Sequence, residues 1–451
     1  MNINKNTKKK KNKKAPWKEY KLHIIILFIV IIAELIGMQR IYLSSTVSIV
    51  IMPLLYSMIM GLGLYLIKPF TAIGNHESKV AEGLMMLFMT PILAKLAVSS
   101  GQALNVLITV GPAIILQEFG NLGTIFFALP IALLLGFKRE SIGMTSSICR
   151  EPNLGIIMDK YGFKSPETRG VLTIYIIGTV IGTVFISLLA SLSTALPLHP
   201  YALAMASGVG SASMNAAAIS PLLAMFPSMA ENMEAFAGFS NLISFCFGLY
   251  LTLFIGLPLT EKLYNWLEPK IGRTTCVSTD ENNYDTSDMK KVNQSKEISK
   301  ISKKRVLDWI ILLVIFSVIV SVGNTVHTHK PFVTALIGML LLSAMSLVSV
   351  ILERIVPKHI SSIIYVSIIG ILLSMPWSPV SGYIVPYIKN VDLVSIVTVF
   401  LAYVGVSIGR DWDQFKKLGY RGAIVTCFVI TGTYIGSAVI AQLVLLATGA
   451  I

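Results

Sequence analysis

The segment KNTKKKKNKKAPWKEYKLHIIILFIVIIAELIG, residues 5–37, places nine lysines before the apolar run Leu22–Gly37. Apolar runs recur along the chain, for example at Ser45–Ile67, Val171–Ala195 and Arg421–Leu446. A helix needs roughly 20 mostly apolar residues to cross a bilayer, because lipid offers its backbone no hydrogen-bond partner. The pattern predicts an all-α, polytopic membrane protein.

The composition supports this assignment. Hydrophobic residues make up 54% of the 451 residues and charged residues only 13%, against about 25% in an average soluble protein. The net charge of +14 could indicate a nucleic-acid partner, but the basic residues lie beside the apolar runs, where anionic lipid attracts them. We therefore expect membrane lipid as a partner and no nucleic acid. The four cysteines have neither CxxC nor metal-ligand spacing, so no disulfide and no metal site is expected.

The basic residues also predict an orientation. With the polybasic start inside, all but four of the 37 lysines and arginines fall on the cytoplasmic side; the four are Arg40, Lys95, Lys330 and Lys389. No small-residue cleavage site follows the first apolar run, so this run should remain as an anchor. We expect a multi-pass protein of the bacterial plasma membrane with a cytoplasmic N-terminus.

This orientation limits how many apolar pieces can cross. Residues 81–100, 102–118 and 120–137 lie between two cytoplasmic positions, so only two of these pieces can cross fully. Residues 200–227 and 236–256 pose the same conflict, because only one crossing is allowed there. One piece at each place should be re-entrant or broken, and such backbone is tolerated only inside protein or beside a polar cavity. The count gives about 11 crossings, with the C-terminus outside.

The first odd piece, residues 200–227, is rich in small and hydroxyl residues. Its glycines permit unusual backbone angles, and its proline is expected to interrupt the helical hydrogen bonds. Discontinuous helices of this type bind anions at free N–H groups and Na⁺ at free carbonyls in transporters. Tight helix packing is the alternative, because small residues also line helix interfaces. The candidate binding residues here are Ser207, Gly208, Gly210, Ser211, Ser213, Asn215 and Pro221.

The second odd piece, residues 99–123, has polar residues and glycines on both sides of a short apolar core. Its acid, Glu118, is expected within the protein at membrane depth, with an interfacial loop as the alternative. Nearby, Lys95 could pair with a substrate carboxylate or extend to the interface. Glu34 is expected near a span end, and His327 is expected to be solvated in a short outer loop, with metal binding as the alternative. The candidate residues from this region are Lys95, Gln102, Asn105, Glu118 and Asn121.

A polar linker separates two predicted transmembrane halves. The expected divisions are a polybasic tail at 1–21, a first half at 22–265, a flexible cytoplasmic linker at 266–306 and a second half at 307–451. A short repeat, GTVIG at 178–182 and GTYIG at 432–436, occurs once in each half. The predicted orientation makes the two spans parallel, whereas many transporter repeats are inverted. Convergent packing through Gly-x-x-x-Gly is the alternative to a duplication.

Three stretches carry a resemblance to a known family: SICREPNL at 147–154, SPETRG at 165–170 and the small-residue stretch 207–218. They resemble a bacterial multi-span family catalogued as domain of unknown function 3100, over most of the chain outside the N-terminus and linker. More generally, the broken segments are similar to those of sodium- or proton-coupled carboxylate symporters. That second likeness implies two inverted five-span halves around crossed discontinuous helices.

These observations predict a secondary active transporter for a small anionic organic solute, coupled to Na⁺ or H⁺. The alternatives are a channel and a membrane-embedded enzyme acting at the cytoplasmic interface. We expect no enzyme, because the chain has no Gly-x-Ser-x-Gly or His-Glu-x-x-His motif and few acids or histidines in its spans. No cofactor is expected other than Na⁺ as a coupling ion, and a homodimer is one option for its assembly.

Cysteine labelling tests the predicted orientation. In a cysteine-free background, single cysteines placed within 271–300 should resist an impermeant thiol reagent added to intact cells. A Thr328→Cys variant should react, because the reagent reaches only the outer loops. The opposite labelling pattern would overturn the orientation and the count of crossings based on it.

Overall fold

The computed structural model describes residues 15–42, 48–67, 73–146, 151–162, 164–272, 302–356 and 361–451. Within these ranges eight helical segments are long and apolar enough to cross a membrane, and three shorter apolar helices accompany them. The predicted all-α, polytopic fold class is therefore confirmed. Part of the motif at 147–154 and the middle of the predicted linker, 273–301, lie outside the described residues.

The first part of the chain differs from the prediction at one place. A 3₁₀ turn, η1 (Pro16–Lys18), and helix α1 (Tyr20–Ile36) precede a hairpin of β1 (Gln39–Tyr42) and β2 (Ser48–Ile51), and α2 (Pro53–Leu66) follows. The apolar run Ser45–Ile67 is thus a strand and a helix of 14 residues, not one long helix. The β-branched residues of β2 favour an extended backbone, and Pro53 suits the first turn of a helix.

The rest of the described chain is helical. In chain order the elements are α3 (Asn75–Gln102), α4 (Leu104–Leu116), η2 (Gln117–Leu122), α5 (Gly123–Leu134), α6 (Glu140–Thr145), α7 (Glu151–Tyr161), α8 (Pro166–Ser193), α9 (Pro200–Ser207), α10 (Ala212–Met225), η3 (Pro227–Met229), α11 (Ala230–Leu251), η4 (Thr252–Gly256), α12 (Leu257–Ile271), α14 (Lys303–Thr328), α15 (Phe332–Ile355), α16 (Ser362–Ser374), α17 (Ser381–Ile388), α18 (Leu393–Ile408), η6 (Gly409–Asp411) and α19 (Trp412–Thr448). Helical structure thus enters the predicted linker at both ends, through α12 and α14.

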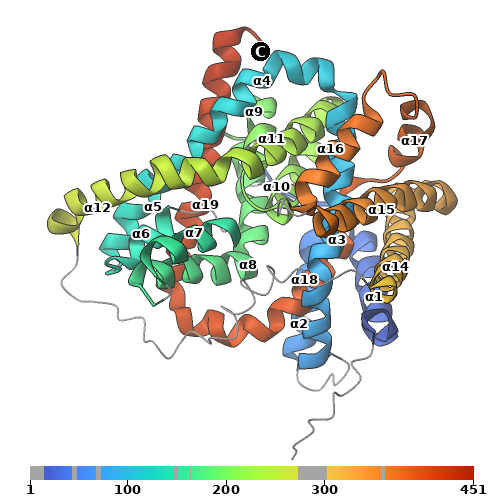
Figure 1. Ribbon diagram of the computed structural model, residues 1–451, viewed down its shortest axis with the longest axis horizontal. Coiled ribbons are helices and arrows are strands. Elements are labelled where there is room, and N and C mark those ends of the chain that lie inside the picture. The colour runs from blue at the N-terminus through green and yellow to red at the C-terminus, as the bar shows by residue number, and fades with distance from the viewer. Residues whose placement is uncertain are drawn as a thin grey trace, which may run out of the picture.

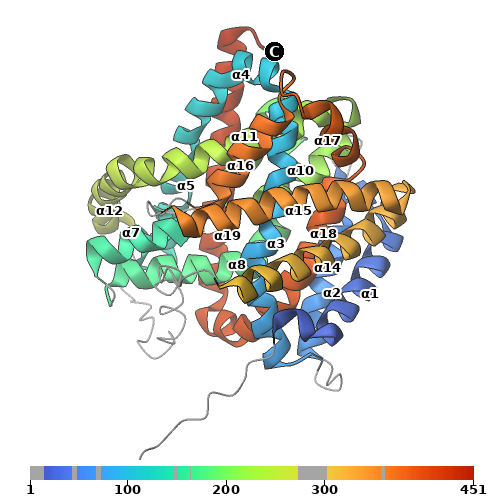
Figure 2. The same cartoon turned by 45° about the vertical axis from the view of Figure 1, so that its right-hand side comes forward.

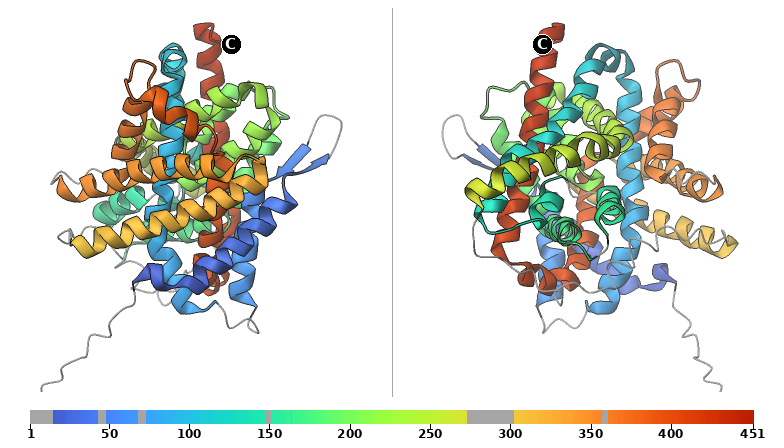
Figure 3. Two further views of the ribbon diagram at one scale, coloured as in Figure 1. Left: turned by 90° about the vertical axis from the view of Figure 1, so that its right-hand side faces the viewer. Right: turned by 60° about the vertical axis from the view of Figure 1, so that its left-hand side comes forward.

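Helix α18 lies in the core, and every one of its residues is buried. Helices α1, α2, α3 and α14 pack around it. The rod formed by α11, η4 and α12 runs across α5 and α19 (Figure 1). Helices α14 and α15 lie side by side and cross α3 at a steep angle (Figures 2 and 3). The elements of both odd pieces, 99–123 and 200–227, pack against α11 in this arrangement.

Both odd pieces are interrupted helices. Helices α4 and α5 are joined by the 3₁₀ segment η2, and together they form one candidate span, Leu104–Leu134. Helices α9 and α10 are separated by residues 208–211, where Gly210 has a φ of 114°. Only a residue without a Cβ adopts that angle readily. The predicted break at Pro221 is wrong, because α10 continues through this residue to Met225.

The two repeat copies lie on helices that pack together. A Cβ added to Gly422 of α19 would meet Thr173 and Ile177 of α8, and one added to Gly182 would meet Ile430. Residue numbers rise together along this contact, so α8 and α19 run parallel. This direction agrees with the predicted orientation of the two copies.

Close backbone contact at glycines brings other helices together. A Cβ on Gly61 of α2 would lie 2.6 Å from the carbonyl oxygen of Ala402 in α18, and one on Gly405 would collide with the Met58 carbonyl. In a membrane, where lipid is as apolar as a leucine side chain, such close approach supplies much of the packing energy.

Alanine at two helical glycines tests this packing. Gly405→Ala should lower the free energy of unfolding by about 1–3 kcal/mol, because the new methyl group has no room. Gly63→Ala is the matched control: nothing lies within 4 Å of its added Cβ, so it should leave stability unchanged or raise it by up to about 1 kcal/mol. Unfolding in detergent micelles measures both. Equal stability of the two variants would contradict the packing assignment.

Candidate functional site

The break between α9 and α10 exposes the start of a helix. The hydroxyl of Ser211 caps α10 by accepting a hydrogen bond from the backbone N–H of Met214. It also lies 3.0 Å from the hydroxyl of Ser213. Both serines are partly exposed, whereas Ala212 and Met214 are buried. The first turn of α10 therefore carries two partly exposed hydroxyl groups at the positive end of its helix dipole.

The other side of the break is held by α11. The side-chain amide of Asn241 donates to the carbonyl oxygen of Gly208 at 2.8 Å and to that of Gly210 at 3.4 Å. The hydroxyl of Ser240 donates to the carbonyl of Met205 at 2.7 Å. Gly208 packs so closely on Ser240 that no Cβ would fit. Three carbonyls at or beyond the end of α9 therefore accept hydrogen bonds from side chains of one neighbouring helix.

The second break surrounds Glu118. This residue is only 4% exposed, so it lies within the protein and not in an interfacial loop. Its carboxylate accepts hydrogen bonds from the side-chain amides of Gln117 and Asn121, both at 2.9 Å, and from the hydroxyl of Ser244 in α11. All three neighbours donate, which matches the acceptor-only character of an ionised carboxylate.

One buried network joins the two breaks. The amide of Gln117, which donates to Glu118, also donates to the hydroxyl of Ser240 at 2.8 Å. Hydrogen bonds thus lead from Glu118 in η2 through Gln117 and Ser240 to the carbonyl of Met205 in α9. We call these side chains, together with Asn215, whose amide donates to the Ala237 carbonyl of α11, the α11 network; its members are Gln117, Glu118, Asn121, Asn215, Ser240, Asn241 and Ser244.

The network has more acceptors than donors. The amide oxygens of Gln117, Asn121, Asn215 and Asn241 are all buried and have no hydrogen-bond donor among the described residues. Each amide nitrogen faces an acceptor; that of Asn215 donates to the Ala237 carbonyl at 3.2 Å. Turning any of these amides around would place two oxygens together. A buried polar atom left unpaired costs about 1–3 kcal/mol, so these four oxygens are expected to bind an ordered water or an ion.

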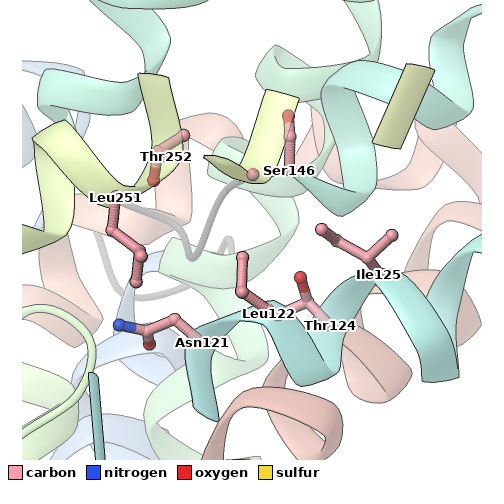
Figure 4. A pocket seen from close by; sticks show the side chains of 8 residues that line it. Asn121, Leu122, Thr124, Ile125, Ser146, Leu251 and Thr252 are labelled. Carbon is pink, nitrogen blue, oxygen red and sulfur yellow. The ribbon is translucent and has the colours of Figure 1, made fainter. Parts of the chain in front are cut away.

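A small pocket adjoins the network (Figure 4). The side chains of Asn121 and Thr124 lie opposite Ser146 and the residues around Thr252 (Figure 4). Thr252 begins η4, a π-helical turn in the α11–α12 rod, and such turns are frequent at functional sites. Asn121 therefore contacts both Glu118 and the pocket. The full lining is Asn121, Leu122, Thr124, Ile125, Ser146, Leu251, Thr252 and Gly256.

Lys95 has a partner inside the protein. Its ammonium nitrogen lies 3.6 Å from a carboxylate oxygen of Glu234 in α11, and its side chain is 8% exposed. The hydroxyl of Ser99 donates to the same carboxylate oxygen at 2.8 Å. Lys95 therefore neither extends to the interface nor offers an unpaired charge to a solute. It ties α3 to the helix that carries the network.

The remaining predicted residues lie apart from the network or serve the backbone. Gln102 donates to the Ser374 carbonyl and to the Ser381 hydroxyl at the far end of α3, and Asn105 is exposed. The hydroxyl of Ser207 donates to the Leu203 carbonyl within its own helix, and Pro221 is buried inside α10.

Sequence reasoning missed the polar residues of α11. Ser240 and Ser244 are four residues apart, so they lie on one helix face, with Asn241 beside them. This spacing on an otherwise apolar helix was the available signal. It also missed a cluster at His327, which lies 3.1 Å from Glu34 and 3.7 Å from Asp392. His327 is therefore paired with Glu34 and mostly shielded from solvent, not solvated as predicted.

Comparisons with known proteins give a family but no activity. The family described as "Protein of unknown function (DUF3100)" matches residues 31–266, slightly more than half of the chain. No curated protein and no solved structure matches. The matched region contains both breaks and the whole α11 network.

Substitution of Lys95 tests its pairing. Lys95→Met should lower the free energy of unfolding by about 3 kcal/mol, because it leaves Glu234 buried without its cation. Adding Glu234→Gln should restore most of this loss. Chemical unfolding in micelles measures both variants. A double variant no more stable than Lys95→Met would show that the two side chains do not act as a pair.

Proposed function

We propose a transport function for this chain, which belongs to the DUF3100 family: it is a secondary active transporter that moves a small anionic organic solute together with a cation. The observation that supports this most strongly is the α11 network. Two interrupted segments, each costly in lipid, share the polar side chains of one helix. Membrane proteins keep such backbone where it lines a cavity or binds a substrate.

The break between α9 and α10 suits an anion on one side. The first turn of α10 offers backbone N–H groups at the positive end of the helix dipole. The hydroxyls of Ser211 and Ser213 are partly exposed there, and each can donate a hydrogen bond to a carboxylate. Lys95 is bonded to Glu234, so the helix terminus supplies the attraction for the solute.

The same break suits a cation on its other side. The carbonyl oxygens of Gly208 and Gly210 lie there beside the Asn241 side chain, whose own amide oxygen is buried without a donor among the described residues, and Gln117 links this region to Glu118. An anion and a cation bound on opposite sides of one break lower each other's electrostatic cost. That mutual benefit is the physical basis of coupled transport.

Counterflow in proteoliposomes tests the transport function. Vesicles loaded with one unlabelled carboxylate, chosen from citrate, malate and glutamate by a thermal-shift screen, should transiently accumulate the labelled form. Exchange of this kind requires a carrier. A channel would only equilibrate the label, and an enzyme would consume it; either result would overturn the proposal.

Two variants of α10 locate the anion site within that assay. Ser211→Ala combined with Ser213→Ala should raise the solute concentration for half-maximal exchange about tenfold, as loss of two hydrogen bonds predicts. Ser220→Ala is the matched control on the same helix, because its hydroxyl donates only to the Ala216 carbonyl of its own helix. An equal effect of both changes would point to helix packing instead.

A further inference from the structure

We infer that the amide oxygens of Asn215, Asn241 and Gln117 bind a dehydrated monovalent cation of the Na⁺ class, beside the break between α9 and α10. That this cation binds follows from the geometry of the three amides. That it is the coupling ion of transport rests on the proposed function. The three residues come from three elements, α10, α11 and η2. They are 0%, 1% and 0% exposed, respectively.

The orientation of the three amides carries the argument. Each nitrogen already donates to an oxygen acceptor: Asn215 to Ala237, Asn241 to Gly208, and Gln117 to Glu118. Each oxygen is left buried with no donor among the described residues. Because every nitrogen faces an oxygen, no rotation of an amide removes the surplus. A surplus of buried oxygens is satisfied by a cation or by a donor such as water.

The three side chains are linked through one stretch of α11 beside the break. Asn241 of α11 donates to the carbonyls of Gly208 and Gly210, and Asn215 lies in the first turn of α10, next to the break. Asn215 also bonds Ala237, one helical turn before Asn241. Gln117 bonds Ser240, the neighbour of Asn241. The three side chains thus converge on one stretch of α11.

The ligand chemistry favours a monovalent ion. The proposed ligands are neutral amide oxygens, with backbone carbonyls of the break beside them, and hard cations prefer oxygen ligands. Glu118 supplies a carboxylate that is hydrogen-bonded to Gln117. One carboxylate near neutral oxygens balances a single positive charge. No cluster of three or more His, Cys, Asp or Glu suited to a metal ion occurs in the described part of the chain, which argues against a divalent site.

Thermal unfolding of the purified full-length protein tests the site. NaCl should raise the melting temperature above that in choline chloride at equal ionic strength, because a ligand specific for the folded state stabilises it. In Asn215→Leu the apparent Na⁺ affinity should fall about tenfold or more, since an oxygen ligand is lost. The melting temperature without Na⁺ should fall only modestly, because the substitution also removes the one hydrogen bond from the Asn215 nitrogen to the Ala237 carbonyl; the lost Na⁺ response is the result that identifies the site.

The matched control is Asn324, another fully buried asparagine. Its nitrogen donates to the Asn390 carbonyl, and its oxygen accepts from the Asp392 backbone. Asn324→Leu should therefore lower the melting temperature without Na⁺ and keep the full Na⁺ response. Asn215→Asp retains an oxygen at the site and should keep the Na⁺ response. It tests the role of this oxygen even if the leucine variant fails to fold.

Several outcomes would overturn the site. Identical melting curves in NaCl and choline chloride would show that no Na⁺ binds. A full Na⁺ response in Asn215→Leu would remove this residue from the site and leave water as the partner of its oxygen. The counterflow assay gives an independent result. Counterflow without stabilisation by Na⁺ would support the carrier and rule out the cation site. Stabilisation by Na⁺ without counterflow would support the cation site and rule out the carrier.

Discussion

A helix that stops inside a membrane leaves carbonyl groups that lipid cannot satisfy, and this constraint organises the molecule. At the end of α9 the carbonyls of Met205, Gly208 and Gly210 accept hydrogen bonds from Ser240 and Asn241 of α11. At Gly208 and Gly210 these bonds take the place of the helical bonds that the break removes, and at Met205 the side-chain bond adds to the backbone bond from Gly208. These hydrogen bonds hold α11 against the break. The neighbouring polar residue Ser244 of α11 is therefore buried as well.

Close packing at glycines keeps the second break in place. The GTYIG copy in α19 lies directly against η2 and α5: a Cβ on Gly120 would collide with Ser437, and one on Gly436 would meet the carbonyl of Gly120. The GTVIG copy in α8 lies against α10, where Gly182 faces Met214. Each copy of the repeat thus supports one of the two interrupted segments. A shared structural task explains their similarity, whether it arose by duplication or by convergence.

The sequence predicted the elements better than their partners. Hydropathy and charge bias identified most of the long helices and both interrupted segments, because lipid thickness and backbone bonding act on local sequence; the run Ser45–Ile67 is the exception. The unusual backbone expected at the glycines occurs at Gly210, whereas the helix continues through Pro221. The pairing of Lys95 with Glu234 was also out of reach, since these residues are far apart in the chain and only the fold brings them together.

The α11 network differs from a purely structural one in how its polar groups are distributed. A network that only held helices together would gain stability from pairing every donor with an acceptor. Here the donors are used up and the buried oxygens of Asn215, Asn241 and Gln117 remain, while the serines on the other side of the break are partly exposed. Under the proposed function, the serines bind the anionic solute and the buried oxygens bind the cation. Because α11 contacts both interrupted segments, binding of either ligand changes the balance of forces on the same helix, and a carrier needs such a shared element to couple two ligands.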